Sequence, residues 1–118
     1  MIELDVKNFI DENLDYKAYM ERPTKYTDAF FVIEKISGGR TEHLDTARVT
    51  IQTYAPSMYL AASICEKLND AMLNDFIVLP NITSVELIST YNYPDTATKN
   101  YRYQSLFEIY YYGGNENG

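Results

Sequence analysis

The segment 46–73 constrains the fold most strongly, because its periodicity changes from that of a strand to that of a helix within a few residues. In its first part Ala47, Val49 and Ile51 alternate with polar residues, the period of two that is typical of a strand with one buried face. Pro56 and Ser57 then end the strand, since proline has no amide hydrogen for a ladder but fits a helix start, where serine can cap free amides. The segment therefore predicts a strand that leads directly into a helix.

The second part of this segment has the spacing of an amphipathic helix. Its apolar residues recur three and four positions apart, as Ala61, Ile64, Cys65, Leu68 and Met72. Its polar residues fall on the other side, as Glu66, Lys67, Asn69 and Asp70. We therefore expect one stripe of this helix to pack on a sheet, with Cys65 as a small core residue.

The flanking segments predict a second helix and four further strands. Residues 4–14 place Leu4, Ile10 and Leu14 on one side, with Val6 and Phe9 near it, and Asp5 is the expected N-cap. Strands are expected at 16–20, 30–36, 82–91 and 101–112 from their alternation and their aromatic and β-branched content. In the strand 82–91, alternation places Val85, Leu87 and Ser89 on one face and Glu86, Ile88 and Thr90 on the other.

The predicted order is α, β, β, β, α, β, β. This order predicts an α+β fold, a mainly antiparallel β-sheet on which the central amphipathic helix and the short N-terminal helix pack. At 118 residues the chain is expected to form a single domain over 1–112. The glycine- and asparagine-rich tail 113–118 is expected to be disordered.

The connection between the strand 30–36 and the central strand has two interpretations. The run from Ser37 through Gly38 and Gly39 to Arg40 is a turn signal, which predicts a hairpin. The polar residues 37–45 lack clean alternation, however, so the connection can also extend from 34 to 45 as a long mobile arm.

Net charge and hydropathy exclude several classes of protein. The net charge of −7 argues against an electrostatic grip on nucleic acid, which needs clustered lysine and arginine. No stretch approaches the ~20 apolar residues of a membrane span. The acidic N-terminal segment lacks the basic and apolar regions of a signal peptide, so a cytoplasmic product is expected.

The residues of a catalytic or metal site are not found in a suitable pattern. His43 stands beside Glu42, but neighbouring side chains on an extended chain point apart, so a solvated loop is expected there. One cysteine and one histidine are too few for a zinc site. Asp11, Glu12 and Asp15 lack the spacing of a calcium loop. We therefore expect no enzyme activity, no cofactor, and no catalytic or metal-binding residue.

Tyrosine is unusually frequent, with twelve residues concentrated toward the C-terminus. Tyr91, Tyr93, Tyr101 and Tyr103 lie in or beside the connection 92–100 of an expected hairpin. They can form cross-strand aromatic pairs, a protein-contact patch, or a stacking platform for single-stranded nucleic acid. A stacking platform normally has a basic groove, whereas only Lys99 and Arg102 are near in sequence, which disfavours the last interpretation.

Four segments carry a resemblance to a known family. They are the strand FFVIEKI, a hairpin into the strand TARVTIQTYA, the helix AASICEKLNDAML and the strand YRYQSLFEIYYY near the end. Their order and hydrophobicity over residues 29–112 resemble the small tail terminator (tail completion) proteins of long-tailed bacteriophages and prophages.

The resemblance implies a structural, non-enzymatic protein of the virion that is assembled in the cytoplasm of the bacterial host. It implies a homo-oligomeric ring, expected to be hexameric, that caps the head-proximal end of the tail tube. There the ring would stop polymerisation of the tube protein and present a surface to the head connector proteins, while DNA passes through without specific binding and no membrane is involved.

Closure of a ring needs two different, complementary surfaces on each subunit. The first expected surface is the connection 37–45, with Gly38, Gly39, Arg40, Glu42 and His43. The second is the tyrosine-rich hairpin 91–103, with Tyr91, Tyr93, Tyr101 and Tyr103.

Two other functions remain open at this stage. A head–tail connector, or head-completion protein, shares the size and the ring-forming habit of a terminator. A small peptide- or ligand-binding module would use the tyrosine patch, and it predicts a monomer with a concave aromatic pocket.

Overall fold

The computed structural model describes residues 1–25, 28–97 and 100–113. Its elements in chain order are α1 (Ile2–Asn13), β1 (Ala18–Tyr19), β2 (Phe30–Thr41), β3 (Leu44–Ala55), α2 (Met58–Asn74), the 3-10 helix η1 (Phe76–Val78), β4 (Ile82–Asn92) and β5 (Tyr101–Tyr111). The predicted order of helices and strands and the α+β class are confirmed. Of the tail 113–118, which was expected to be disordered, residues 114–118 lie outside the described residues.

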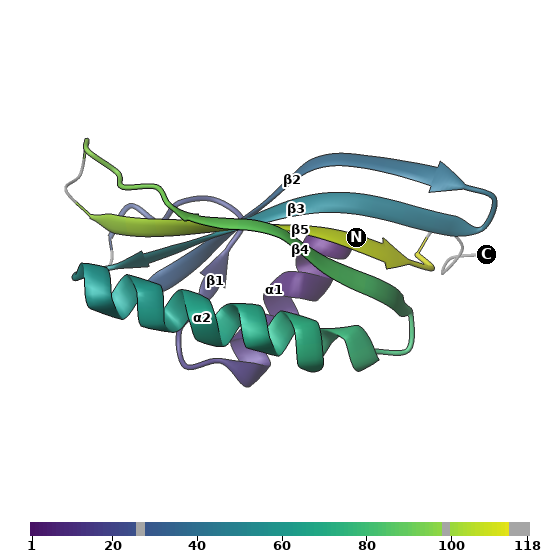
Figure 1. Ribbon diagram of the computed structural model, residues 1–118, viewed down its shortest axis with the longest axis horizontal. Coiled ribbons are helices and arrows are strands. Elements are labelled where there is room, and N and C mark those ends of the chain that lie inside the picture. Colours follow the sequence, from purple (N-terminus) through teal and green to yellow (C-terminus); the bar gives the residue numbers. More distant parts are fainter. Residues whose placement is uncertain (26–27, 98–99, 114–118) are drawn as a thin grey trace.

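The five strands form one sheet in the order β1-β2-β3-β5-β4. β2, β3, β5 and β4 are antiparallel to their neighbours, whereas the two-residue strand β1 runs parallel to β2. Both helices lie against the same face of this sheet (Figure 1). We call that side the helix face and the opposite side the outer face.

The core lies between the helix face and the two helices. Val49 of β3 stands opposite Phe107 of β5, and both are wholly buried. The predicted stripe of α2 packs here, because Ala61, Ile64, Cys65, Leu68 and Met72 are all buried. Ser57 caps α2 as expected, its hydroxyl accepting a hydrogen bond of 3.2 Å from the amide of Leu60.

The N-terminal helix begins earlier than the sequence suggested. It starts at Ile2 with Met1 as its N-cap, so the expectation that Asp5 caps it is wrong. Leu4 is 41% exposed, because the buried side of α1 is formed by four residues at helical spacing, Ile2, Val6, Phe9 and Ile10. A stripe that begins at Ile2 leaves Leu4 facing solvent.

Two of the expected strands differ in detail. The strand expected at 16–20 is reduced to Ala18–Tyr19. In β4, the register shifts between Leu87 and Ser89, so Ile88 forms a bulge. Beyond the bulge Ser89 lies opposite Leu106 and Thr90 opposite Ser105, which exchanges the faces predicted for these two residues, because one inserted residue inverts the alternation that follows it.

Candidate assembly interface

Residues 34–50 form a paired β-hairpin with one bulge, and we call its segment 34–45 the arm. Its pairing continues from Glu34 opposite Thr50 to Thr41 opposite Leu44, so the interpretation as an irregular connection is wrong. The chain reverses at Glu42 and His43, two residues beyond the predicted turn signal, and Glu42 has the left-handed φ of 57°. The ladder therefore runs straight through Gly38 and Gly39, where the sequence predicted the turn.

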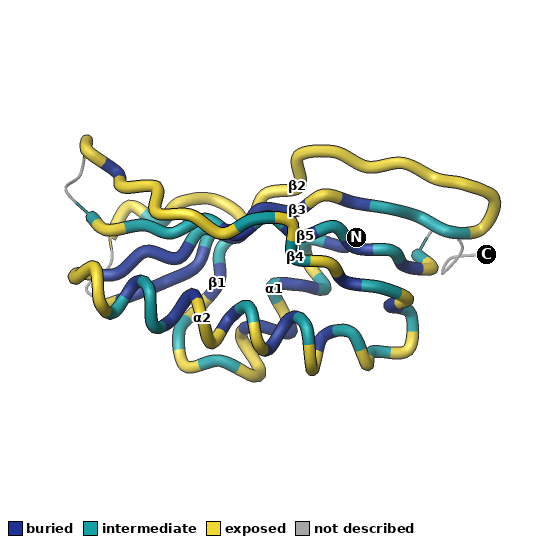
Figure 2. The backbone as a smooth tube through the Cα atoms, in the orientation of Figure 1, coloured by how far each residue is buried: buried dark blue, intermediate teal, exposed yellow. Residues whose placement is uncertain are grey.

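The arm extends past the part of the sheet that the helices cover. Every residue of β2 from Glu34 to Thr41 is exposed, while Phe30, Phe31 and Ile33 at its beginning are buried (Figure 2). A register shift between Lys35 and Ser37 makes Ile36 a bulge, and the Ile36 side chain is 52% exposed. Eight of the twelve residues of β2 are therefore exposed and contribute nothing to the core of the single chain.

Local contacts hold the arm in shape. Arg40 and Asp45 form a two-point ion pair with N–O distances of 2.6 and 3.2 Å, and the hydrogen bond from Arg40 lowers the pKa of Asp45. The side chain of Lys35 crosses Gly38, since a Cβ atom at Gly38 would stand 2.8 Å from the Lys35 Cε atom. These contacts favour a preformed hairpin.

The structure does not bring the four predicted tyrosines together. Tyr91 and Tyr93 are 44% and 42% exposed, with ring centroids 5.8 Å apart. Tyr103 packs against the core and, by its register opposite Thr53, lies on the helix face. Tyr101, which is 39% exposed, follows the same alternation in β5 as Tyr103 and stands opposite Ala55.

An aromatic cluster that the sequence analysis missed surrounds Tyr54 on the outer face. The Tyr54 ring stacks on Phe30 at 4.6 Å, and its hydroxyl accepts a 2.9 Å hydrogen bond from Arg102. The guanidinium of Arg102 also lies 4.0 Å from the centroid of Tyr93. Arg22, from the loop after β1, lies 5.5 Å from the centroid of Tyr54 and forms an ion pair of 2.8 Å with Asp95. The cluster therefore ties that loop to the β4–β5 connection.

The arm and the Tyr54 cluster lie at opposite ends of the long axis of the molecule (Figure 1). The principal extents are 44 × 25 × 24 Å. The arm and the tyrosine-rich hairpin are therefore separate surfaces, as two unlike contacts of one subunit must be.

The outer face carries a mixed set of charges between these two ends. Arg48 pairs with Glu108 at 3.1 Å across β3 and β5, and Glu86 of β4 stands next to Glu108 in the register. The negative charge of Glu108 is the main cause that raises the pKa of Tyr110. Arg48 is thus paired with the carboxylate of Glu108, and Arg102 contacts Tyr54 and Tyr93.

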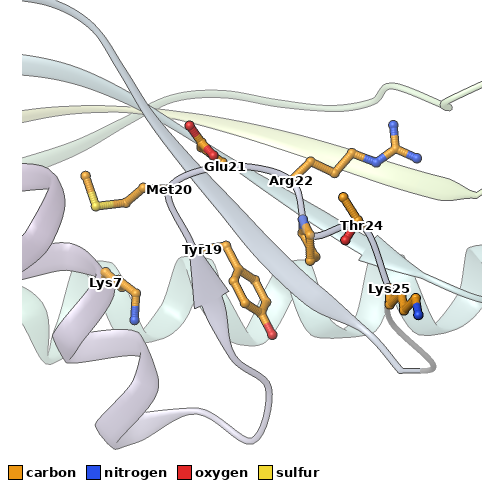
Figure 3. A pocket seen from close by; sticks show the side chains of 8 residues that line it. Lys7, Tyr19, Met20, Glu21, Arg22, Thr24 and Lys25 are labelled. Atoms are coloured by element: carbon orange, nitrogen blue, oxygen red, sulfur yellow. The ribbon is translucent and has the colours of Figure 1, made fainter.

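Figure 3 shows a shallow pocket of about 530 Å³ between α1 and the loop after β1. Its lining residues are Lys7, Tyr19, Met20, Glu21, Arg22, Pro23, Thr24 and Lys25. None of the four predicted tyrosines lines it. It is therefore not the concave tyrosine pocket that a ligand-binding module predicts.

Asp11, near the end of α1, has structural partners. Asp11 accepts hydrogen bonds from Lys7 at 2.6 Å and from the amide of Ala18 at 2.9 Å. Partial burial acts to raise the pKa of Asp11, but these bonds and the lysine charges lower it overall. Among the described residues, no three His, Cys, Asp or Glu side chains are grouped to hold a metal ion, and no helix there is long and apolar enough to cross a membrane.

Cys65 is buried, as predicted, with its sulfur 3.3 Å from the hydroxyl of Ser105. Burial is the main cause that raises the pKa of this thiol. We expect Cys65 to react with a thiol reagent only when the chain unfolds. Because the folded state holds the proton more tightly, its contribution to stability is present below the unfolded pKa of about 8.5 and is lost as the pH rises beyond it.

The measurement is the free energy of unfolding at pH 8 and pH 10 for the wild type and for Cys65→Ala. The wild type should lose more stability between the two pH values than the variant does. Equal losses, or rapid reaction of the folded wild type with the reagent at pH 8, would contradict a buried, protonated thiol.

The chain was also compared with known proteins. No protein-family model matches it, and no curated protein does.

Proposed function

We propose that this protein is a structural assembly protein that closes into a ring, expected to be hexameric, on the head-proximal end of a phage tail tube. In this role it stops polymerisation of the tube protein and offers a surface to the head connector proteins. It acts in the virion after assembly in the cytoplasm of the host. The proposal joins the family resemblance of residues 29–112 to the geometry of the arm.

The arm is the observation that carries the proposal. A hairpin whose β2 strand is exposed from Glu34 to Thr41 lacks the buried apolar area that stabilises strands within one chain. Such an element is best explained by burial against another chain. The arm and the tyrosine-rich hairpin stand at opposite ends, which suits a contact between unlike surfaces and hence a closed ring.

The charges suit a channel through which DNA passes. Each chain contributes a net charge of −7, so a ring of copies is strongly acidic and repels the phosphate backbone. Arg48 and Arg102 of the outer face are occupied by Glu108 and by Tyr54 and Tyr93. If the lumen of an assembled ring proves strongly basic, this part of the proposal is wrong.

The role of the arm is tested by shortening it at its tip, a deletion that removes one pair with another strand, Asp45 opposite Tyr111 of β5. Residues 40–45 are replaced by Asn-Gly, so that Gly39 and Thr46, which are register partners, are joined by a two-residue turn. We expect association, measured by sedimentation equilibrium, to weaken at least tenfold. The thermal unfolding midpoint should change little, because the removed residues are exposed or half-exposed.

A shortened chain that associates as strongly as the wild type would remove the arm from the account. A shortened chain that is unfolded would instead show that the arm stabilises the single chain, which its exposure argues against.

The alternative function is a head–tail connector, which would use the same ring geometry but join finished heads and tails. A peptide- or ligand-binding module is less well supported, because Tyr91 and Tyr103 lie on opposite faces of the sheet and form no common concave surface. That module would be monomeric at all concentrations.

A further inference from the structure

The sheet has two edges that no strand of this chain covers, among the residues described. Among the described residues β1 pairs with Phe31 and Val32 only, so the edge of β2 that faces away from β3 is open along the arm. At the other edge, β4 is paired to β5 alone. Unpaired edges are templates for another strand, and soluble proteins normally cover or disrupt them.

The two open edges run in opposite directions. β2 is antiparallel to β3, β3 to β5, and β5 to β4, so β4 is antiparallel to β2. A second copy placed beside the first in the same orientation therefore brings its β2 against β4 as an antiparallel pair. Each further copy can place its β2 against β4 of the copy before it in the same way, which is the geometry of a head-to-tail contact.

The open edges also present backbone donors. The amide of Phe31 donates to Lys17 on the β1 side, so alternation along β2 directs the amide of Lys35 outward too. The bulge at Ile36 shifts this alternation by one residue, so beyond it the amide of Gly38 points away from β3. On β4, the amide of Tyr93 donates to Arg102 of β5, so the amide of Thr90, three residues earlier, points away from β5.

Each edge carries an exposed isoleucine at a bulge. Ile36 of β2 is 52% exposed and Ile88 of β4 is 45% exposed. A bulge interrupts the regular hydrogen-bonding pattern of a strand, so a second strand can pair along it only if its own backbone follows the same irregularity. Apposition of the two bulges would let each strand accommodate the other and would bury both isoleucines.

We propose that copies of this chain join by antiparallel pairing of the β4 edge of one copy with the arm edge of the next, with Ile88 of one against Ile36 of the other. The occupant of each edge is thus a second copy of this chain, and the sheet continues from subunit to subunit. This inference makes the β4 edge, in place of the tyrosine-rich hairpin, the surface that the arm contacts in the proposed ring, and it rests on that function only in assuming self-association.

The test uses opposite charges at the two isoleucines in the full chain. Ile36→Lys and Ile88→Glu are made singly and together, and association is measured by sedimentation equilibrium. Each single variant should weaken association at least tenfold. The double variant, and an equimolar mixture of the two single variants, should regain most of it, because each contact then joins lysine to glutamate or isoleucine to isoleucine. Both positions are exposed, so unchanged circular dichroism and unfolding midpoints are expected.

Val78→Lys is the matched control, since Val78 is 73% exposed and lies on η1, outside both edge strands. It should leave association unchanged. An equal loss in this control, association that only one of the single variants weakens, or no rescue in the double variant would overturn the pairing. A wild-type chain that is monomeric up to about 1 mM would overturn it as well.

The outcome is separable from that of the proposed function. Strong association that neither isoleucine variant weakens overturns the edge pairing and leaves the ring proposal standing. Rescue by the charge swap, together with normal tails in particles that lack the protein, supports the pairing and overturns the terminator role.

Discussion

Replacement of Phe107 by alanine is expected to destabilise the chain by about 3–5 kcal/mol, as for other fully buried phenylalanines. Phe107 is wholly buried on β5, between Val49 of β3 and Leu87 of β4 in the register. Truncation leaves a cavity under the middle of the sheet. Because β5 is hydrogen-bonded to β3 on one side and to β4 on the other, the strands cannot move to fill this cavity. Since total stabilities are about 5–15 kcal/mol, much of the population should unfold in mild urea.

Urea denaturation followed by circular dichroism gives this difference directly. Phe107→Leu is the control, because it keeps most of the apolar volume and should cost less than half as much. A loss below about 1 kcal/mol for Phe107→Ala would mean that the β3–β5–β4 register is not the one described.

The second large effect is expected for Tyr54→Ala, at about 3 kcal/mol, by comparison with other buried aromatic residues. Tyr54 is only 3% exposed and is held between Phe30 and the guanidinium groups of Arg22 and Arg102. Its removal also takes away the surface on which the loop after β1 rests. We expect faster trypsin cleavage after Lys25 of this loop in the variant than in the wild type, whereas Pro23 prevents cleavage after Arg22 in both.

Tyr54→Phe separates the ring from the hydroxyl. It removes only the group that accepts the hydrogen bond from Arg102, at an expected cost of about 1 kcal/mol. Equal losses for the alanine and phenylalanine variants would assign the stability to the hydroxyl network, and a trypsin pattern unchanged in Tyr54→Ala would show that the cluster does not hold the loop.

Local sequence patterns predicted the fold correctly where the spacing of the buried residues matches the period of the secondary structure. In α2 the stripe from Ala61 to Met72 and the cap at Ser57 were readable, because each depends on neighbours within one helical turn. The prediction failed where a contact between residues distant in sequence determines where an element begins. Asp5 has the chemistry of a cap, but α1 begins at Ile2 because its buried side already includes that residue.

Bulges were the second source of error in the predicted strands. Alternation assigns faces correctly only while the register is unbroken, and Ile88 breaks it in β4. In the arm, all residues from Glu34 to Thr41 are exposed, so no alternation of apolar and polar residues marks the strand there. The two adjacent glycines predict a turn, but they lie within the ladder.

The arm and the described part of the tyrosine-rich hairpin lie at opposite ends of the molecule. The four tyrosines of the predicted interface, however, are divided between the two faces of the sheet. The Tyr54 cluster had no signal in the sequence, because Arg22 and Asp95 meet only through the fold. The open edges likewise follow from the strand order, which local periodicity does not contain.

The most direct test of the proposed function is electron microscopy of particles from the phage or prophage that carries this gene, after the gene is deleted. The account predicts tails of abnormal and variable length, and restoration of a uniform length when the wild-type chain is supplied. Tails of normal length lying apart from filled heads would contradict termination and assign the protein to head–tail joining. Unchanged virions would contradict both roles.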